Sequence, residues 1–190
     1  MSDFTQKYDA AISLLTARGA PSVDHSGDGL LAHLVATCDL LQSWGNSEDI
    51  CLAGLCHAVY GTDGFECALL DLNERDLVQE IIGSDAEGFV YLYASCDRKT
   101  FYPTIARGPA KFRDRFTDTV HEPSEEMVRA CLELTLANDV EIARREETFL
   151  KYLQPHHSEF FVRSKAFISE AGFKDFCEVY GVREEASSAQ

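Results

Sequence analysis

Apolar side chains recur along most of this chain at intervals of three and four residues, a spacing that gathers them on one face of an α-helix. Ser, Asp, Asn and Gly residues, which are typical at helix ends, separate the periodic segments. The predicted fold class is therefore all-α, with seven to nine helices. The pattern predicts helices over residues 3–18, 26–44, 47–61, 66–72, 74–83, 84–97, 124–149, 158–171 and 174–180.

Residues 98–122 break the helical pattern, because two prolines and a glycine interrupt them. Stretches with strand-like composition at 100–105 and 112–117 predict a short β-hairpin in the region 100–117. No internal repeat or low-complexity segment is present. We expect a main helical domain over 1–155, a C-terminal helical extension packed on it over 156–182, and a disordered tail over 183–190.

The charge balance limits the class of partner. The chain has 190 residues, with 32 acidic and 17 basic side chains and a net charge of −15. Nucleic acid and anionic membranes would be repelled, so we expect neither as a partner. A small phosphorylated ligand in a local basic pocket remains compatible with this charge. The oligomeric state is not predicted.

The cysteines and the apolar runs indicate a cytoplasmic protein. No apolar run approaches the roughly 20 residues that cross a bilayer, and the first residues, MSDFTQKYDA, do not resemble a secretory signal. The seven cysteines are an odd number and include no CxxC motif. Most of them fall at apolar helical positions, so we expect reduced core residues. These are Cys38, Cys51, Cys56 and Cys131.

Two of the six histidines, His33 and His57, lie in the middle of apolar helical segments, an unusual place for a side chain that titrates near neutral pH. His33 lies 11 residues before Trp44, and His57 lies 10 residues after Ser47. Successive helices with a short connection pack antiparallel, so both imidazoles stand at a similar height above the turn. They could share one metal ion, or they could be core histidines that bond to backbone or hydroxyl groups.

The segment HSGDGLLAHLVATCDLLQSWGNSEDICLAGLCHAVYG, from His25 to Gly61, resembles the HD superfamily of metal-dependent phosphohydrolases, most closely its alarmone (ppGpp) hydrolase branch. It is also similar to a smaller HD-like group marked by HSG…H…HAVYGT, whose activity the sequence does not indicate. In the superfamily an early helix supplies a histidine, and a later helix ending in a pattern such as AALLHD supplies a histidine and an aspartate. A distant helix supplies a last aspartate. The resemblance implies an HD-like helical domain that binds a divalent metal, often manganese.

The chain departs from the HD pattern at Ala58, which stands where the superfamily has the aspartate after the second histidine. The last aspartate corresponds to Asn138 or, one step later, to Asp139; these point about 100° apart, so only one can face the site. If Asn138 faces it, both carboxylates are lost and weak or no metal binding is expected. His25 is an additional candidate ligand, and a nitrogen-rich site suits Mn, Zn or Fe. The predicted metal ligands are His25, His33, His57 and Asp139, with His57 and Asp139 catalytic.

Basic side chains gather between residues 98 and 122, against the acidic background of the chain. Guanidinium groups suit phosphate, and in the alarmone hydrolases basic residues near the metal hold the diphosphates. The resemblance thus implies that Arg107, Arg113 and Arg115 bind substrate, with Tyr60 lining the same pocket. The alternative is a solvated loop whose arginines pair with neighbouring acids, and a tyrosine that belongs to the core.

Three functions follow from the resemblance. The first is a metal-dependent hydrolase of a small phosphorylated or nucleotide-like compound, in which the metal activates a water molecule. The second is a catalytically inactive HD-like domain that binds a small molecule or a protein, which Ala58 favours. The third is an iron-dependent HD-type oxygenase. An enzyme is favoured, but fold analogy alone cannot choose among the three.

Overall fold

The computed structural model describes residues 2–25, 29–65 and 67–183, without the side chains of 153–156. Within these ranges most residues are helical and one small antiparallel hairpin is present, so the predicted all-α class with a short hairpin is confirmed. Short 3-10 helices lie at Ala20–Ser22, Leu72–Glu74 and Lys165–Phe167. The α-helices are α1 (Asp3–Ala17), α2 (Leu30–Ser43), α3 (Glu48–Cys56), α4 (Arg75–Ile82), α5 (Ser84–Ser95), α6 (Arg98–Phe101), α7 (Glu125–Arg145), α8 (Glu147–Arg163) and α9 (Glu170–Tyr180).

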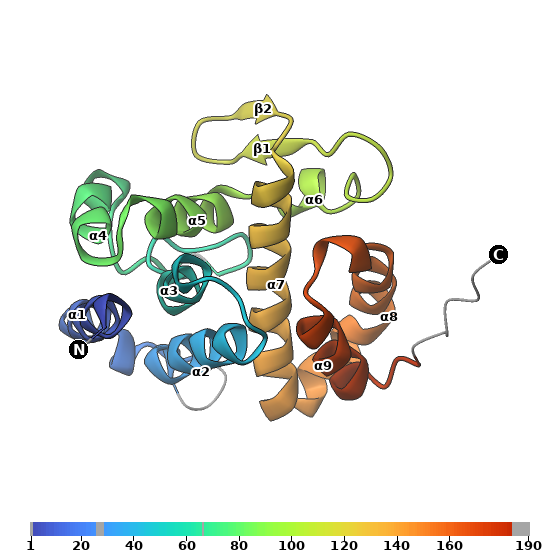
Figure 1. Cartoon of the computed structure of the whole chain (residues 1–190), viewed down its shortest axis with the longest axis horizontal. Coiled ribbons are helices and arrows are strands. Elements are labelled where there is room, and N and C mark those ends of the chain that lie inside the picture. Colours follow the sequence, from blue (N-terminus) through green and yellow to red (C-terminus); the bar gives the residue numbers. More distant parts are fainter. Residues whose placement is uncertain (1, 26–28, 66, 184–190) are drawn as a thin grey trace.

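Helix α7 runs through the middle of the molecule, with α2, α3 and α5 on one side and α8 and α9 on the other (Figure 1). Ser124 caps its start by accepting a hydrogen bond from the backbone N–H of Met127. Acidic residues occupy its first turn and arginines its last turn, as the helix dipole favours. Almost every residue from 130 to 143 is buried. The helix therefore supplies side chains to the interfaces on both of its sides.

Helices α2 and α3 follow each other after a short connection and pack closely at Gly54. A Cβ atom at Gly54 would lie 2.3 Å from Cδ1 of Leu41, a fully buried side chain. Only a residue without a side chain lets the two helices approach this far. This close approach sets the separation of the histidines that the two helices carry.

Replacing Gly54 by alanine is expected to lower the free energy of unfolding by roughly 1–3 kcal/mol, because the added methyl group overlaps Leu41 in a packed core. Gly88 in α5 is the matched control, since a Cβ atom there meets nothing within 4 Å. Gly88→Ala should raise the free energy of unfolding by about 0.5–1 kcal/mol through helix propensity. Urea unfolding measures both, and a Gly54→Ala protein as stable as the wild type contradicts the packing argument.

The hairpin joins β1 (Phe112–Asp114) to β2 (Thr119–His121), so the predicted first strand at 100–105 is wrong. That stretch begins instead with the end of α6, which Asp97 caps by accepting a hydrogen bond from Thr100 N–H. The turn between the strands is set by Asp114, whose Oδ1 accepts from the N–H groups of the two residues after Arg115. The strand β1 therefore pairs with the segment that follows it within five residues, and not with residues 100–105, which the proline-containing loop separates from it.

Other predicted helices also differ from the structure. The predicted helix over 66–72 is absent from 67–71, where the N–H groups of Leu69 and Leu70 both donate to the carbonyl of Val59. The predicted helices over 124–149 and 158–171 are also divided differently, because α7 ends at Arg145 and α8 runs from Glu147 to Arg163. The predicted helix starts at Ser26 or Asp28 and the predicted tail from 184 onward lie outside the described residues.

The C-terminal helix α9 starts at Glu170, before the predicted start at residue 174, and so includes Gly172. A Cβ atom at Gly172 would lie 3.0 Å from Cε3 of Trp44, so the glycine allows α9 to approach the end of α2. The four cysteines predicted to be reduced core residues, Cys38, Cys51, Cys56 and Cys131, are free and buried. Among the described residues, no helix combines the length and the apolar character that a membrane crossing requires.

Candidate functional site

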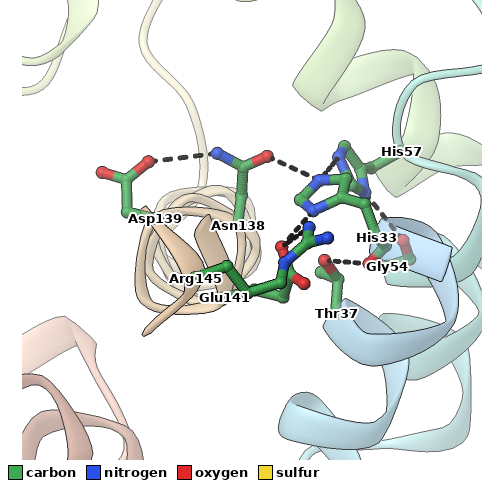
Figure 2. A network of polar contacts seen from close by, with 8 residues as sticks. All are labelled: His33, Thr37, Gly54, His57, Asn138, Asp139, Glu141 and Arg145. Carbon is green, nitrogen blue, oxygen red and sulfur yellow. Dashed lines mark hydrogen bonds and ion pairs between the residues drawn. The ribbon is translucent and has the colours of Figure 1, made fainter. Parts of the chain in front are cut away.

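The structure brings His33 and His57 together in the core between α2, α3 and α7. His33 lies within α2, and His57 caps the C-terminal end of α3. Both side chains are buried, and their Nε2 atoms are 3.3 Å apart (Figure 2). The two residues are 24 positions apart in sequence, and the short connection between their helices places them at matching depth.

Each imidazole is oriented by a hydrogen bond from its other ring nitrogen. His57 Nδ1 donates to the carbonyl oxygen of Gly54 at 2.7 Å, and His33 Nδ1 contacts the carboxylate of Glu141. Burial would raise the pKa of Glu141, but the hydrogen bonds and charges of His33 and Arg145 hold it below its usual value, so the group is a carboxylate. Burial, with the nearby His33, lowers the pKa of His57 to about 3. His57 is therefore neutral, and its Nε2 presents a lone pair to His33.

Asn138, not Asp139, faces the histidine pair. Its Oδ1 lies 3.2 Å from Nε2 of His33, while its Nδ2 donates to Oδ1 of Asp139 at 3.1 Å (Figure 2). The second carboxylate oxygen of Asp139 accepts a hydrogen bond from His157 Nδ1 at 2.6 Å. The sequence left open whether Asn138 or Asp139 faces the histidine pair. The amide of Asn138 contacts His33, and the carboxylate of Asp139 binds His157 of α8.

The atoms around His33 Nε2 include some, but not all, of the ligands that a divalent metal requires. Two imidazole nitrogens and one amide oxygen converge, and Glu141 holds one imidazole as a carboxylate commonly does behind a metal-bound histidine. The part of the chain that the structure describes contains no group of three or more His, Cys, Asp or Glu side chains suited to hold a metal ion. The converging donors carry no negative charge, because Asn138 contributes an amide oxygen and Ala58 contributes no donor atom. They do not match the HD ligand set.

His25 lies next to this pair, with its ring centroid 4.4 Å from that of His33 and 5.0 Å from that of Phe65. Burial and the neighbouring His33 lower its pKa to about 4, so the ring is neutral. Its Nε2 is buried and has no hydrogen-bond partner within the described structure. The rings of His25 and His33 are tilted by 53°, and His25 also lines the adjacent pocket.

A pocket of about 760 Å³ opens beside the histidines, between the loop after α3, α6, α7 and α8. A cavity of this size accommodates a small molecule. Its lining includes two cations, the carboxylates of Asp63 and Asp139, and the amide of Asn138. The charged, imidazole and amide side chains of the lining are His25, Asp63, Arg98, Lys99, Asn138, Asp139 and His157.

Arg98 lines the pocket, although it was not among the residues predicted to bind substrate. Its Nε is buried and has no hydrogen-bond partner within the described structure. Its guanidinium carbon lies 5.1 Å from the ring centroid of Tyr93. Its own backbone N–H donates to Asp63 at 3.0 Å, which ties the start of α6 to the loop after α3. No local pattern in the sequence marks Arg98, because residues 98–122 were predicted to break the helical pattern.

The four residues predicted to bind substrate lie outside this pocket. The Tyr60 hydroxyl donates to Glu87 in the core, and Arg107 pairs with Glu159 on the surface. The other two arginines belong to the hairpin. Arg113 pairs with Asp97 and Asp118, and Arg115 Nε donates to the carbonyl of Ala94.

Residues 14–98 match the model of a protein family described as a domain of unknown function, DUF6817. The matched stretch contains His25, His33 and His57 and ends at Arg98, so it precedes Asn138. No curated protein and no solved structure matches the chain.

Proposed function

We propose that this protein is an HD-like domain that binds a small phosphorylated compound in the pocket beside the histidine pair. The observation that carries the proposal is Arg98, a pocket-lining guanidinium whose buried Nε has no hydrogen-bond partner in the described structure. A buried N–H group without an acceptor is costly, and a ligand oxygen would satisfy it. Guanidinium groups favour phosphate oxygens over neutral acceptors.

Further features support an anionic ligand at this place. Lys99 adds a second positive charge to the same pocket, in a chain whose net charge is −15. His25 Nε2 is a second buried polar atom without a partner in the described structure, and it lines the same pocket. The resemblance of residues 25–61 to phosphohydrolases agrees with a phosphorylated ligand, and Ala58 agrees with binding that does not depend on a metal.

Removing the Arg98 guanidinium should weaken anion binding by about 10- to 100-fold, the loss of one charge-assisted hydrogen bond of roughly 1.5–3 kcal/mol. Isothermal titration calorimetry with inorganic pyrophosphate and with GDP, in EDTA, compares wild type with Arg98→Gln. Arg129→Gln is the matched control, because Arg129 is an exposed arginine of α7 that pairs with Glu125. Equal affinity in Arg98→Gln and the wild type, or no binding of either probe, would overturn the proposal.

A metal-dependent HD-type hydrolase is the second candidate, and the convergence of His33 Nε2, His57 Nε2 and Asn138 Oδ1 favours it. Because none of these donors is negatively charged, oxygens of a bound phosphate would have to supply the missing negative charge. Elemental analysis of protein purified without a metal-affinity column, wild type beside His57→Ala, tests this candidate.

The identity of a bound metal would distinguish the metal-dependent hydrolase from the iron-dependent oxygenase. Near-stoichiometric manganese or zinc that disappears in His57→Ala supports the hydrolase, and iron supports the HD-type oxygenase. His121→Ala, on the exposed strand β2, controls for the loss of a histidine elsewhere. No metal after incubation with manganese, zinc and iron removes both enzymes and leaves the binding domain.

A further inference from the structure

Asp139 and His157 form a hydrogen-bonded pair between α7 and α8. His157 Nδ1 donates to Oδ2 of Asp139 at 2.6 Å, and Asn138 Nδ2 donates to Oδ1 at 3.1 Å. The Asp139 side chain is buried, so these two donors compensate for its lost hydration. Because Nδ1 faces a carboxylate, it carries a proton, and Nε2 is the ring nitrogen left to act on another group.

Asp139 and His157 line the same cavity as Arg98 and Lys99. His157, Arg98 and Lys99 all line the pocket of about 760 Å³, and a quarter of the His157 side chain remains exposed. The cavity has room for a ligand and a water molecule. A phosphate held by Arg98 would therefore occupy the same cavity as an imidazole whose orientation a buried carboxylate fixes.

We propose that His157 is a general base that activates water for hydrolysis of a phosphate ester or anhydride bound at Arg98 and Lys99, an inference that rests on the proposed binding function. Nε2 takes a proton from water as the water oxygen bonds to phosphorus. The bond between phosphorus and the leaving oxygen breaks, and that oxygen takes the proton from the imidazolium. Water is the only co-reactant, and His157 returns to its neutral form.

The neighbouring side chains have distinct parts in this step. Asp139 is a positioning residue that fixes the ring tautomer and stabilises the imidazolium, as the carboxylate does in a catalytic triad. The positive charges of Arg98 and Lys99 offset the charge on the phosphate oxygens in the transition state. The alternative is a pair that only joins α7 to α8, and this alternative predicts a loss of stability without a change in catalysis.

The experiment measures phosphate release from GDP and from inorganic pyrophosphate in EDTA. His157→Gln is the central variant, because the glutamine amide can still donate to Asp139 but cannot act as a base. We expect kcat to fall by about 100-fold with KM unchanged. Asp139→Asn should lower kcat by about tenfold or more without loss of probe binding, and His121→Ala should leave phosphate release unchanged.

The outcomes separate this inference from the proposed function. Probe binding without phosphate release from the wild type overturns the general base and leaves the binding function in place. Release that EDTA abolishes, or that His157→Gln retains, also overturns it. Failure of both probes to bind overturns the proposed function and this inference together. A kcat that falls in His157→Gln while the melting temperature stays the same excludes the purely structural pair.

Discussion

Replacing Glu87 by alanine is expected to lower the free energy of unfolding by about 2–4 kcal/mol. Glu87 in α5 is fully buried and binds three neighbours. Arg75 donates to its two oxygens at 2.6 and 2.8 Å, and Gln79 and the Tyr60 hydroxyl donate at 3.0 and 3.1 Å. Truncation leaves the buried Tyr60 hydroxyl without its acceptor, whereas Arg75 is about one-third exposed and recovers some hydration.

Acid should reduce the contribution of Glu87 to the free energy of unfolding. Burial alone would raise the pKa of Glu87, but hydrogen bonds from Arg75 and Gln79 hold it below the ordinary value of 4.5. A carboxyl group with a lowered pKa in the folded state contributes stability above its unfolded pKa and loses it as the pH falls through the folded pKa. The difference in stability between wild type and Glu87→Gln should therefore shrink as the pH falls below 4.5.

Urea unfolding at neutral and acidic pH measures both effects. Glu80→Ala is the matched control, since Glu80 is an exposed glutamate of the adjacent helix α4. It should change the free energy of unfolding by no more than about 0.5 kcal/mol. A Glu87→Ala protein as stable as Glu80→Ala would show that the buried network contributes nothing to folding.

The approach of His33 to His57 was predictable because it depends on local geometry. Two apolar helical segments with a short connection fix the height of each residue above the turn, and the structure places the two Nε2 atoms 3.3 Å apart. The contacts from α7 were harder to predict. Glu141 meets His33 across 108 residues of sequence, and no local pattern indicates which face of α7 meets α2.

The choice between Asn138 and Asp139 shows the same limit. Neighbouring helix positions differ by about 100° in direction, so an error of one residue exchanges an amide for a carboxylate. The cations illustrate a second limit. Arg113 and Arg115 stood out by their clustering, but Arg113 pairs with Asp97 and Arg115 donates to the carbonyl of Ala94. Arg98, in contrast, has a buried Nε without a partner in the described structure. Charge in a sequence does not indicate which cation is left without a partner.

Replacing Asn138 by aspartate is expected to create a tighter metal site and to raise the affinity for Mn²⁺ by about tenfold or more. The new carboxylate would stand where the amide oxygen now lies, 3.2 Å from Nε2 of His33. It would supply the negative charge that the converging donors lack, next to an imidazole already held by Glu141. This prediction concerns the second candidate function and tests whether the loss of a carboxylate is what weakens metal binding.

The same variant should be less stable than the wild type without metal, by about 1–3 kcal/mol. Asp139 would lose the hydrogen bond from Asn138 Nδ2 and gain a negative neighbour. Because bound metal stabilises the folded state by mass action, Mn²⁺ should raise the melting temperature of Asn138→Asp far more than that of the wild type. Asn73→Asp adds the same charge at an exposed position and should show no such response. If Mn²⁺ leaves the melting temperature of Asn138→Asp unchanged, the histidine pair is a core contact and a carboxylate at position 138 does not turn it into a metal site.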